Sequence, residues 1–226
     1  MATKDEILTR LLKEENYVSG EELARQTGVS RAAVWKAIKS LKKSGYDIEG
    51  VTKCGYKLKQ NNSLVTAEGV KALLEKDIEV THFDTIDSTN TYCKRLLADG
   101  KQGEFLVTAA KQTAGRGRQG KSFYSPSETG IYFSLVIRPD TSLQNAVTAT
   151  TAAAVAVCKA IEKTTDLKPK IKWVNDVYLN GKKVCGILTE ATTDFESGTV
   201  DSVIIGIGIN ITTTNFPIDV QGAGSL

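Results

Sequence analysis

The strongest constraint on the fold comes from two short helices predicted on either side of a glycine-containing turn near the N-terminus. Apolar residues recur at helical spacing across residues 4–14, which predicts a first amphipathic helix. Residues 19–26 begin with the capping-box pattern Ser-x-x-Glu, and a second N-cap follows in the turn at residues 27–30. A third helix is predicted over residues 31–43. Two short helices around such a turn are typical of a helix-turn-helix.

Positive charge is concentrated in this N-terminal segment. Residues 1–60 contain 12 Lys or Arg and 8 Asp or Glu, whereas the remainder contains 17 and 18. Residues 31–43 carry no acidic residue, and the alternating pattern of residues 45–58 predicts a hairpin, or wing. This arrangement predicts DNA binding, with the basic helix in the major groove and the wing on phosphate. We expect the DNA contacts to come from Ser30, Arg31, Lys36 and Lys39.

Two structural alternatives exist for these sixty residues: a small helical bundle with a solvated lysine face, or a protein-docking module. The agreement of turn, cap and wing favours DNA binding over both. Helix-turn-helix proteins commonly dimerise over two half-sites. A dimer would therefore have to form through another part of the chain.

Composition excludes several classes of protein. The four cysteines form no C-x-x-C pair, and a single histidine excludes an H-E-x-x-H zinc site. The N-terminus is charged and lacks the apolar core of a signal peptide. The longest weakly apolar stretch, residues 149–158, is about half the length of a membrane span. We therefore expect a reduced, cytoplasmic protein with no membrane partner.

Residues 61–63 form a polar break, so we expect three parts: a winged helix-turn-helix over 1–60, a linker over 61–65, and a larger domain over 66–226. Helices are predicted at residues 66–74, 88–97 and 144–163. Strands are predicted at residues 79–84, 104–109, 131–137, 170–173, 177–179, 184–190 and 200–209. Asn180 and Gly181 are a strong hairpin signal. Hairpins mixed with a few helices favour an α+β fold with a mixed sheet.

The most unusual segment of this domain is Gly-Arg-Gly-Arg-Gln-Gly-Lys at residues 115–121. Its glycines leave backbone N–H groups free to approach an anion, and its guanidinium groups supply fixed positive charge. It is not a P-loop, because no Gly-Lys-Ser/Thr closes it. Read alone, the segment indicates an anion site and a flexible basic or RNA-binding loop equally well.

Three further segments are candidates for chemistry. Residues 172–190 place Asn175 and Asp176 at a strand junction and Lys183 after a tight turn; Asp and Asn oxygens suit Mg²⁺, although such pairs are also ordinary turn residues. Glycines in the strand at residues 206–210 allow close approach of a ligand or mark a bulge. Residues 87–90 could be only a helix N-cap.

In combination, residues 87–90, 112–120, 172–183, 186–188 and 206–210 resemble the biotin protein ligases, of the bifunctional type that also acts as biotin operon repressor. The resemblance covers essentially the whole chain. It implies a class II synthetase-like catalytic domain that converts biotin and ATP to biotinyl-5′-adenylate and transfers biotin to a lysine of biotin carboxyl carrier protein. It also implies biotin-responsive binding to operator DNA by a ligand-promoted homodimer.

The resemblance also implies roles for individual residues. The catalytic cations would be Lys183, Arg116 and Arg118. The biotin-binding residues would be Ser88, Thr89, Gln112, Gly115, Arg116, Arg118, Lys183 and Gly186. The nucleotide-binding residues would be Arg118, Lys121, Phe123, Asn175 and Asn210. Asp176 would contact Mg²⁺.

The chain departs from the family pattern at three places. Phe123 stands where the family often has Trp, and Val174 stands where Pro is common. Family members usually continue with a small β-barrel domain implicated in ATP and acceptor binding, so we expect this chain, which ends at Leu226, to lack it. Two other functions stay open: a ligand-sensing repressor without ligase activity, and a lipoate–protein ligase. The second is less favoured, because lipoate ligases rarely carry a winged helix.

Overall fold

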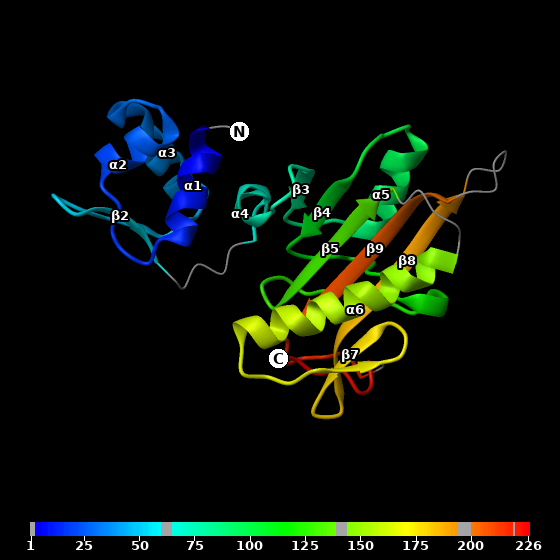
Figure 1. Ribbon diagram of the computed structural model, residues 1–226. Coiled ribbons are helices and arrows are strands. Elements are labelled where there is room, and N and C mark those ends of the chain that lie inside the picture. The colour runs from blue at the N-terminus through cyan, green and yellow to red at the C-terminus, as the bar shows by residue number, and fades with distance from the viewer. Residues whose placement is uncertain (1–2, 60–64, 139–143, 194–199, 219) are drawn as a thin grey trace. The chain divides into compact units, whose positions relative to one another are not determined.

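The structure is a computed structural model that describes residues 3–59, 65–138, 144–193, 200–218 and 220–226 (Figure 1). The chain divides into two compact units, Met1–Asp77 and Ile78–Leu226. Within the described residues, no helix has the length and apolar character needed to cross a membrane.

The N-terminal unit contains a helix-turn-helix followed by a hairpin. Its elements are α1 (Thr3–Lys13), α2 (Gly20–Thr27), α3 (Arg31–Lys43), β1 (Ile48–Val51), β2 (Gly55–Leu58) and α4 (Ala67–Leu73). Ser19 and Ser30 cap α2 and α3 by accepting hydrogen bonds from Glu22 N and Ala33 N. Gly28 ends α2 in the left-handed conformation, with φ of 67°. The predicted helix-turn-helix and wing are therefore confirmed.

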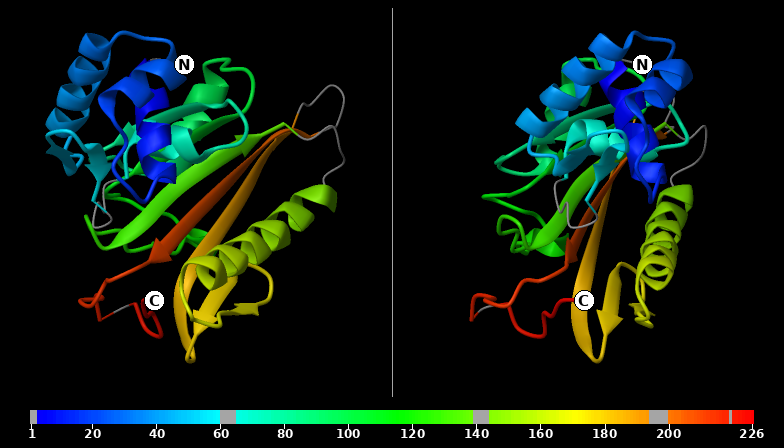
Figure 2. Two further views of the ribbon diagram at one scale, coloured as in Figure 1. Left: turned by 60° about the vertical axis from the view of Figure 1, so that its left-hand side comes forward. Right: turned by 90° about the vertical axis from the view of Figure 1, so that its left-hand side faces the viewer.

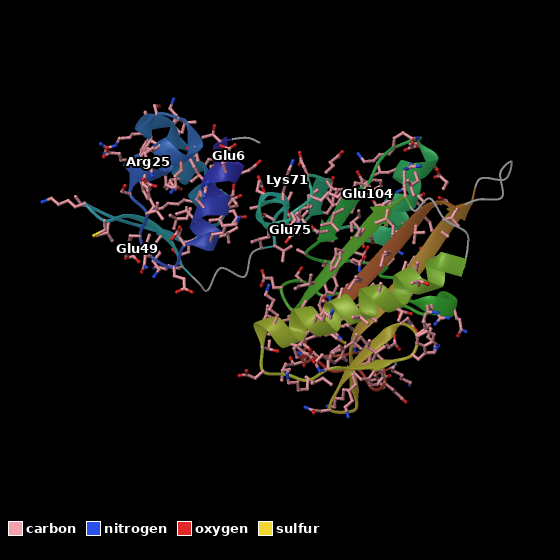
Figure 3. All side chains as sticks on the ribbon, viewed as in Figure 1. Glu6, Arg25, Glu49, Lys71, Glu75 and Glu104 are labelled. Carbon is pink, nitrogen blue, oxygen red and sulfur yellow. The ribbon has the colours of Figure 1, made fainter. Side chains whose placement is uncertain are left out.

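The helical periodicity of this unit places its apolar residues in one core. The fully buried side chains include Ile7 and Leu8 of α1, Leu23 of α2, and Val34 and Leu41 of α3. Charged side chains point outward, as Figure 3 shows for Arg25 and Glu49. The exposed face of α3 therefore takes no part in the core of this unit.

Helix α4 packs against α1 in this unit, although we expected it to begin the second domain. Lys4 of α1 forms an ion pair with Glu68 at 3.0 Å, and the hydroxyls of Tyr46 and Thr66 are hydrogen-bonded. The boundary between units therefore follows Asp77 rather than residues 61–65. Residues 61–64 of the expected linker lie outside the described residues.

The C-terminal unit is built on a seven-stranded mixed sheet of order β3-β4-β5-β9-β8-β7-β6, in which β3 and β4 are parallel and the other neighbours antiparallel. The elements are β3 (Glu79–Phe83), α5 (Thr89–Ala98), β4 (Phe105–Ala109), a short 3₁₀ turn (Arg118–Gly120), β5 (Gly130–Ile137), α6 (Gln144–Thr164), β6 (Lys170–Lys172), β7 (Asp176–Leu179), β8 (Lys182–Thr193) and β9 (Val200–Asn210). The predicted α+β class is confirmed.

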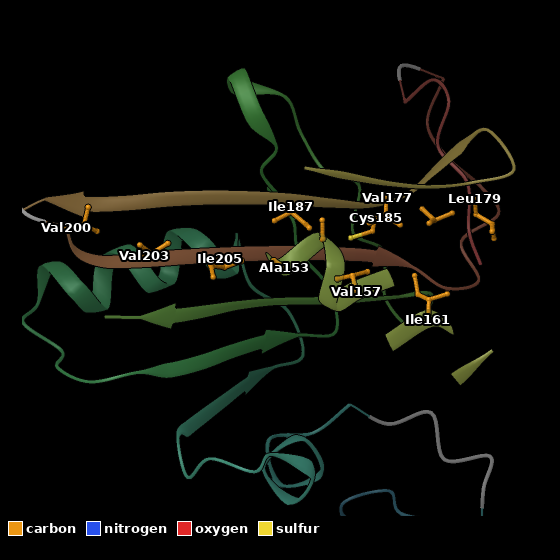
Figure 4. Close-up of a cluster of buried hydrophobic side chains, with 12 residues drawn as sticks. Ala153, Val157, Ile161, Val177, Leu179, Cys185, Ile187, Val200, Val203 and Ile205 are labelled. Carbon is orange, nitrogen blue, oxygen red and sulfur yellow. The ribbon is translucent and has the colours of Figure 1, made fainter. Parts of the chain in front are cut away.

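Helices cover both faces of this sheet (Figure 2). Alternate residues of β9 separate the two layers, because Val203 and Ile205 pack with α6 whereas Ile204 packs with Cys93 of α5. Figure 4 shows the larger core, in which Ala153, Val157 and Ile161 of α6 lie over β7, β8 and β9. By the same alternation, the glycines of β9 lie on the face that α5 covers.

Candidate functional site

A pocket opens where α5 begins, over β5, β8 and β9. Ser88 caps α5, and Thr89 and Asn90 follow in its first turn; all three side chains are buried. The capping requirement thus fixes the position of a helix whose first residues form one wall of the pocket.

Neutral polar groups form a hydrogen-bonded network beside the pocket. Thr89 donates to Gln112 Oε1 from both its backbone N (2.9 Å) and its hydroxyl (3.2 Å), and Gln112 Nε2 donates to Ser125 Oγ at 2.9 Å. Ser134 Oγ, fully buried on β5, lies 2.7 Å from Thr89 Oγ1 and 2.6 Å from Asn90 Oδ1. These partners hold Thr89 and Gln112 in fixed positions, as a site for a neutral polar ligand group requires.

The Gly-Arg segment is part of a hydrogen-bonded excursion between β4 and β5. Gln112 N donates to Ser125 O (3.1 Å), Phe123 N to Gly115 O (2.8 Å), and Gly117 N to Lys121 O (2.7 Å). Gly115 is buried, and a Cβ there would overlap the Phe123 carbonyl oxygen. The segment is therefore a paired loop, which disfavours the alternative of a flexible basic arm.

Three positive side chains also line the pocket, and each has a partner. Lys183 Nζ lies 2.7 Å from Asp176 Oδ1, and Arg118 donates to Asn175 Oδ1 at 3.0 Å. Arg116 reaches Glu190 Oε1 at 3.3 Å. The pocket lining therefore combines neutral polar groups with cations, and an anionic ligand would compete with the two carboxylates for the cations.

Glu190 connects the neutral polar network with the cations. Its carboxylate accepts hydrogen bonds from Lys94 Nζ at 2.7 Å and Asn90 Nδ2 at 3.0 Å, in addition to the Arg116 pair. Burial raises the pKa of Glu190, but the hydrogen bonds from Lys94 and Asn90 and the charges of Lys94 and Arg116 outweigh it, so the pKa lies below its ordinary value.

This depressed pKa predicts a contribution to acid stability. As the pH falls, the unfolded chain protonates Glu190 before the folded chain does, so the stabilisation is complete above about pH 4.5 and is lost as the pH falls through the folded pKa. Glu190→Gln should therefore flatten the decline in the free energy of unfolding below about pH 5, measured by urea unfolding followed by circular dichroism. Glu162→Gln, at an exposed position on α6, is the control. Identical pH slopes for Glu190→Gln and the unsubstituted protein would contradict the assignment.

Glycines shape the floor of the pocket. A Cβ on Gly206 would overlap Asn90 Oδ1, and one on Gly208 would overlap the Phe123 ring. At Gly186 a Cβ would lie 3.0 Å from the same ring. The Phe123 ring thus lies against bare backbone on β8 and β9, where any larger residue would displace it.

The structure brings many of the sequence-predicted residues together. Those that line the pocket are Ser88, Thr89, Gln112, Arg116, Arg118, Phe123, Asn175, Lys183 and Gly186. Asp176 lies beside it through its pair with Lys183. Gly115 is buried within the loop and Lys121 is exposed, and neither lines the pocket. Asn210 is also outside the lining: it is buried, and its Nδ2 donates to Gly224 O at 3.0 Å.

Several contributors were absent from the predicted set. Ser134 could have been identified from the sequence, since it is a small hydroxyl residue within a run of apolar and aromatic residues. Asn90 and Glu190 stood at the ends of segments already singled out, but nothing local indicates that they bond one another. The C-terminal segment was also missed: Lys183 N donates to Gly222 O, and Gly224 N donates to Lys183 O.

The N-terminal unit presents a second candidate site on α3. Arg31, Lys36 and Lys39 are exposed there, as predicted, and Ser30 uses its hydroxyl as the N-cap. A groove between α3 and the hairpin is lined by Arg31, Trp35 and Lys53 among others. Trp35 was not among the predicted residues.

The fold defines a class of protein: a helix-turn-helix module with a hairpin, joined in the chain to an α+β domain that has a polar and cationic pocket on its mixed sheet. Residues 82–210 match the biotin/lipoate A/B protein ligase family, and residues 3–57 match the HTH domain. The chain therefore belongs to the biotin/lipoate A/B protein ligase family.

Individual relatives extend this result. The chain is 39% identical over 210 residues to the bifunctional ligase/repressor BirA of Bacillus spizizenii, covering 91% of this chain and 64% of that protein. It is 33% identical over 204 residues to BirA of Escherichia coli, covering 90% and 62%. The chain thus spans somewhat less than two thirds of these relatives' length.

Solved structures agree with the fold. A biotin protein ligase from Aquifex aeolicus in complex with biotin and ATP superposes with a TM-score of 0.53 at 30% identity, covering 65% of this chain and 58% of that one. A biotin protein ligase from Leishmania major in complex with biotin gives a TM-score of 0.53 at 26% identity, covering 65% and 62%.

Proposed function

We propose that the C-terminal unit binds biotin and ATP and forms biotinyl-5′-adenylate, and that biotin is then transferred to a lysine of a carrier protein. The observation that carries this proposal is that one pocket combines neutral donors and acceptors at Thr89 and Gln112 with cations at Arg116, Arg118 and Lys183. The ureido ring of biotin needs the neutral donors and acceptors, and its carboxylate needs the cations.

The proposed chemistry joins two anions. A biotin carboxylate oxygen attacks the α-phosphorus of ATP, a C–O–P anhydride bond forms, and pyrophosphate leaves with the electrons of the broken P–O bond. Repulsion between the carboxylate and the phosphate opposes this approach, so fixed positive charge lowers the barrier. Lys183 polarises the carboxylate, and Arg116 and Arg118 offset the phosphate charge.

In the second step, a carrier lysine amine attacks the biotinyl carbonyl. An amide bond forms, AMP leaves, and the amine loses its proton. The proposed acceptor is a biotin carboxyl carrier protein.

Asp176 is the proposed contact for Mg²⁺. The described residues contain no group of three or more His, Cys, Asp or Glu that could hold a metal ion by themselves. Mg²⁺ needs only one or two carboxylates when substrate phosphates supply its other ligands, so Asp176 with the neighbouring Asn175 fits that role. The ion would neutralise phosphate charge.

We also propose that the N-terminal unit binds operator DNA as a biotin-responsive repressor, and that ligand binding promotes a homodimer. The capped helices, the hairpin and the basic α3 support DNA binding. A cytoplasmic location remains the expectation for a chain with four free cysteines.

Calorimetric titration with biotin and, separately, with lipoate tests the ligand. Biotin should bind one site per chain and lipoate should not bind. Binding of lipoate alone would replace the proposal with a lipoate ligase, and binding of neither would overturn the assignment of the pocket.

A further inference from the structure

The exposed face of α3 carries a large aromatic side chain that the core does not use. Trp35 is 55% exposed, whereas Val34, Ile38 and Leu41 of the same helix are buried. An indole exposed on a helix whose apolar face is already packed adds nothing to the core. It does provide apolar area for a ligand.

Trp35 lies within a stripe of positive charge. Arg31, Trp35 and Lys39 are spaced four residues apart and so share one face of the helix. Lys39 Nζ lies 5.2 Å from the centre of the Trp35 ring. Arg31 and Trp35 also line the groove that the hairpin closes with Val51 and Lys53.

The composition of this surface selects its occupant. Because α3 carries several basic residues and no acidic residue, it attracts a nucleic-acid duplex, which is a polyanion, more strongly than it attracts a protein surface of mixed charge. The first turns of a recognition helix reach base edges in the major groove, and Trp35 is in the second turn of α3. The apolar group that DNA presents there is the thymine 5-methyl group.

We propose that Trp35 is a specificity-determining residue that contacts thymine methyl groups in the major groove, flanked by Arg31 and Lys39 on phosphate. This inference rests on the proposed DNA binding of the N-terminal unit. It assigns sequence preference to a residue that carries no charge.

The experiment first selects bound sequences from a random duplex pool with the full chain, biotin and ATP. The selected duplex is then remade with deoxyuridine in place of thymine, which removes only the methyl groups. The unsubstituted protein should bind the deoxyuridine duplex about tenfold more weakly. Trp35→Ala should bind the thymine duplex about tenfold more weakly and should not distinguish the two duplexes.

Matched variants separate this role from folding and from charge. Ser40→Ala, exposed on the same helix, should behave like the unsubstituted protein. Lys39→Ala should weaken both duplexes equally and reduce the slope of log affinity against log salt by about one. If Trp35→Ala does not show the helical circular dichroism of the parent protein, Trp35→Gln replaces it in the binding measurements.

The outcomes distinguish the two proposals. No binding of any duplex by the unsubstituted protein would overturn the proposed DNA binding itself. The assignment of Trp35 alone would be overturned if specific binding were unaffected by deoxyuridine, or by both Trp35→Ala and Trp35→Gln. The same result would be obtained if Trp35 contacted a protein partner instead of DNA.

Discussion

Replacing Lys183 with Ala is expected to slow biotin-dependent exchange of labelled pyrophosphate into ATP by about 100- to 1,000-fold, and to weaken biotin binding much less. The Lys183 ammonium lies in the pocket, 2.7 Å from Asp176, with its side chain only 32% exposed. In such a site it can offset the charge that builds up when carboxylate meets phosphate. Because that charge is greatest in the transition state, the loss should appear in the rate more than in the affinity.

Lys182→Ala is the control for this prediction. Lys182 is the preceding residue of β8, is exposed, and does not line the pocket. Its substitution should leave both exchange and biotin affinity within about twofold of the parent. Exchange by Lys183→Ala at the parental rate would contradict the role given to the ammonium group.

Gly206→Ala is expected to lower biotin affinity by about tenfold or more and to destabilise the protein by about 1–3 kcal/mol. The added methyl group would overlap Asn90 Oδ1. Asn90 cannot move aside easily, since it is buried and hydrogen-bonded to Ser134 and Glu190. Displacement of Asn90 would also disturb the hydroxyl of Thr89, because Ser134 Oγ is hydrogen-bonded to both residues.

Calorimetry with biotin and urea unfolding measure the two effects of Gly206→Ala. Ile207→Val is the matched control, because it removes one carbon at the neighbouring position instead of adding one. We expect it to change biotin affinity by less than about fivefold. Parental affinity and stability in Gly206→Ala would show that the floor of the pocket is not packed as described.

Local chemistry made most elements predictable from the sequence. Ser19, Ser30 and Ser88 each cap the helix that was expected to follow them, and Asn180-Gly181 forms the predicted hairpin turn with positive φ at both residues. Such signals act over a few residues and need no knowledge of the rest of the chain.

Long-range pairing was beyond local patterns. The strand order, the packing of α4 on α1, and the ion pair between Arg116 and Glu190 all join residues distant in the sequence. A carboxylate acquires its partner from the fold, so Glu190 had no signature of its own. The segments of the pocket could be grouped beforehand only through resemblance to a family, and the fold then placed most of their residues around one cavity.

The most direct test is to identify the small molecule that the protein holds after incubation with biotin and Mg·ATP. The protein is separated from free ligand and denatured, and the released compound is examined by mass spectrometry. We predict biotinyl-5′-adenylate, formed with an equal amount of pyrophosphate and absent when biotin or ATP is omitted. Recovery of unchanged biotin alone would contradict the proposed ligase chemistry and indicate a ligand-sensing repressor without ligase activity.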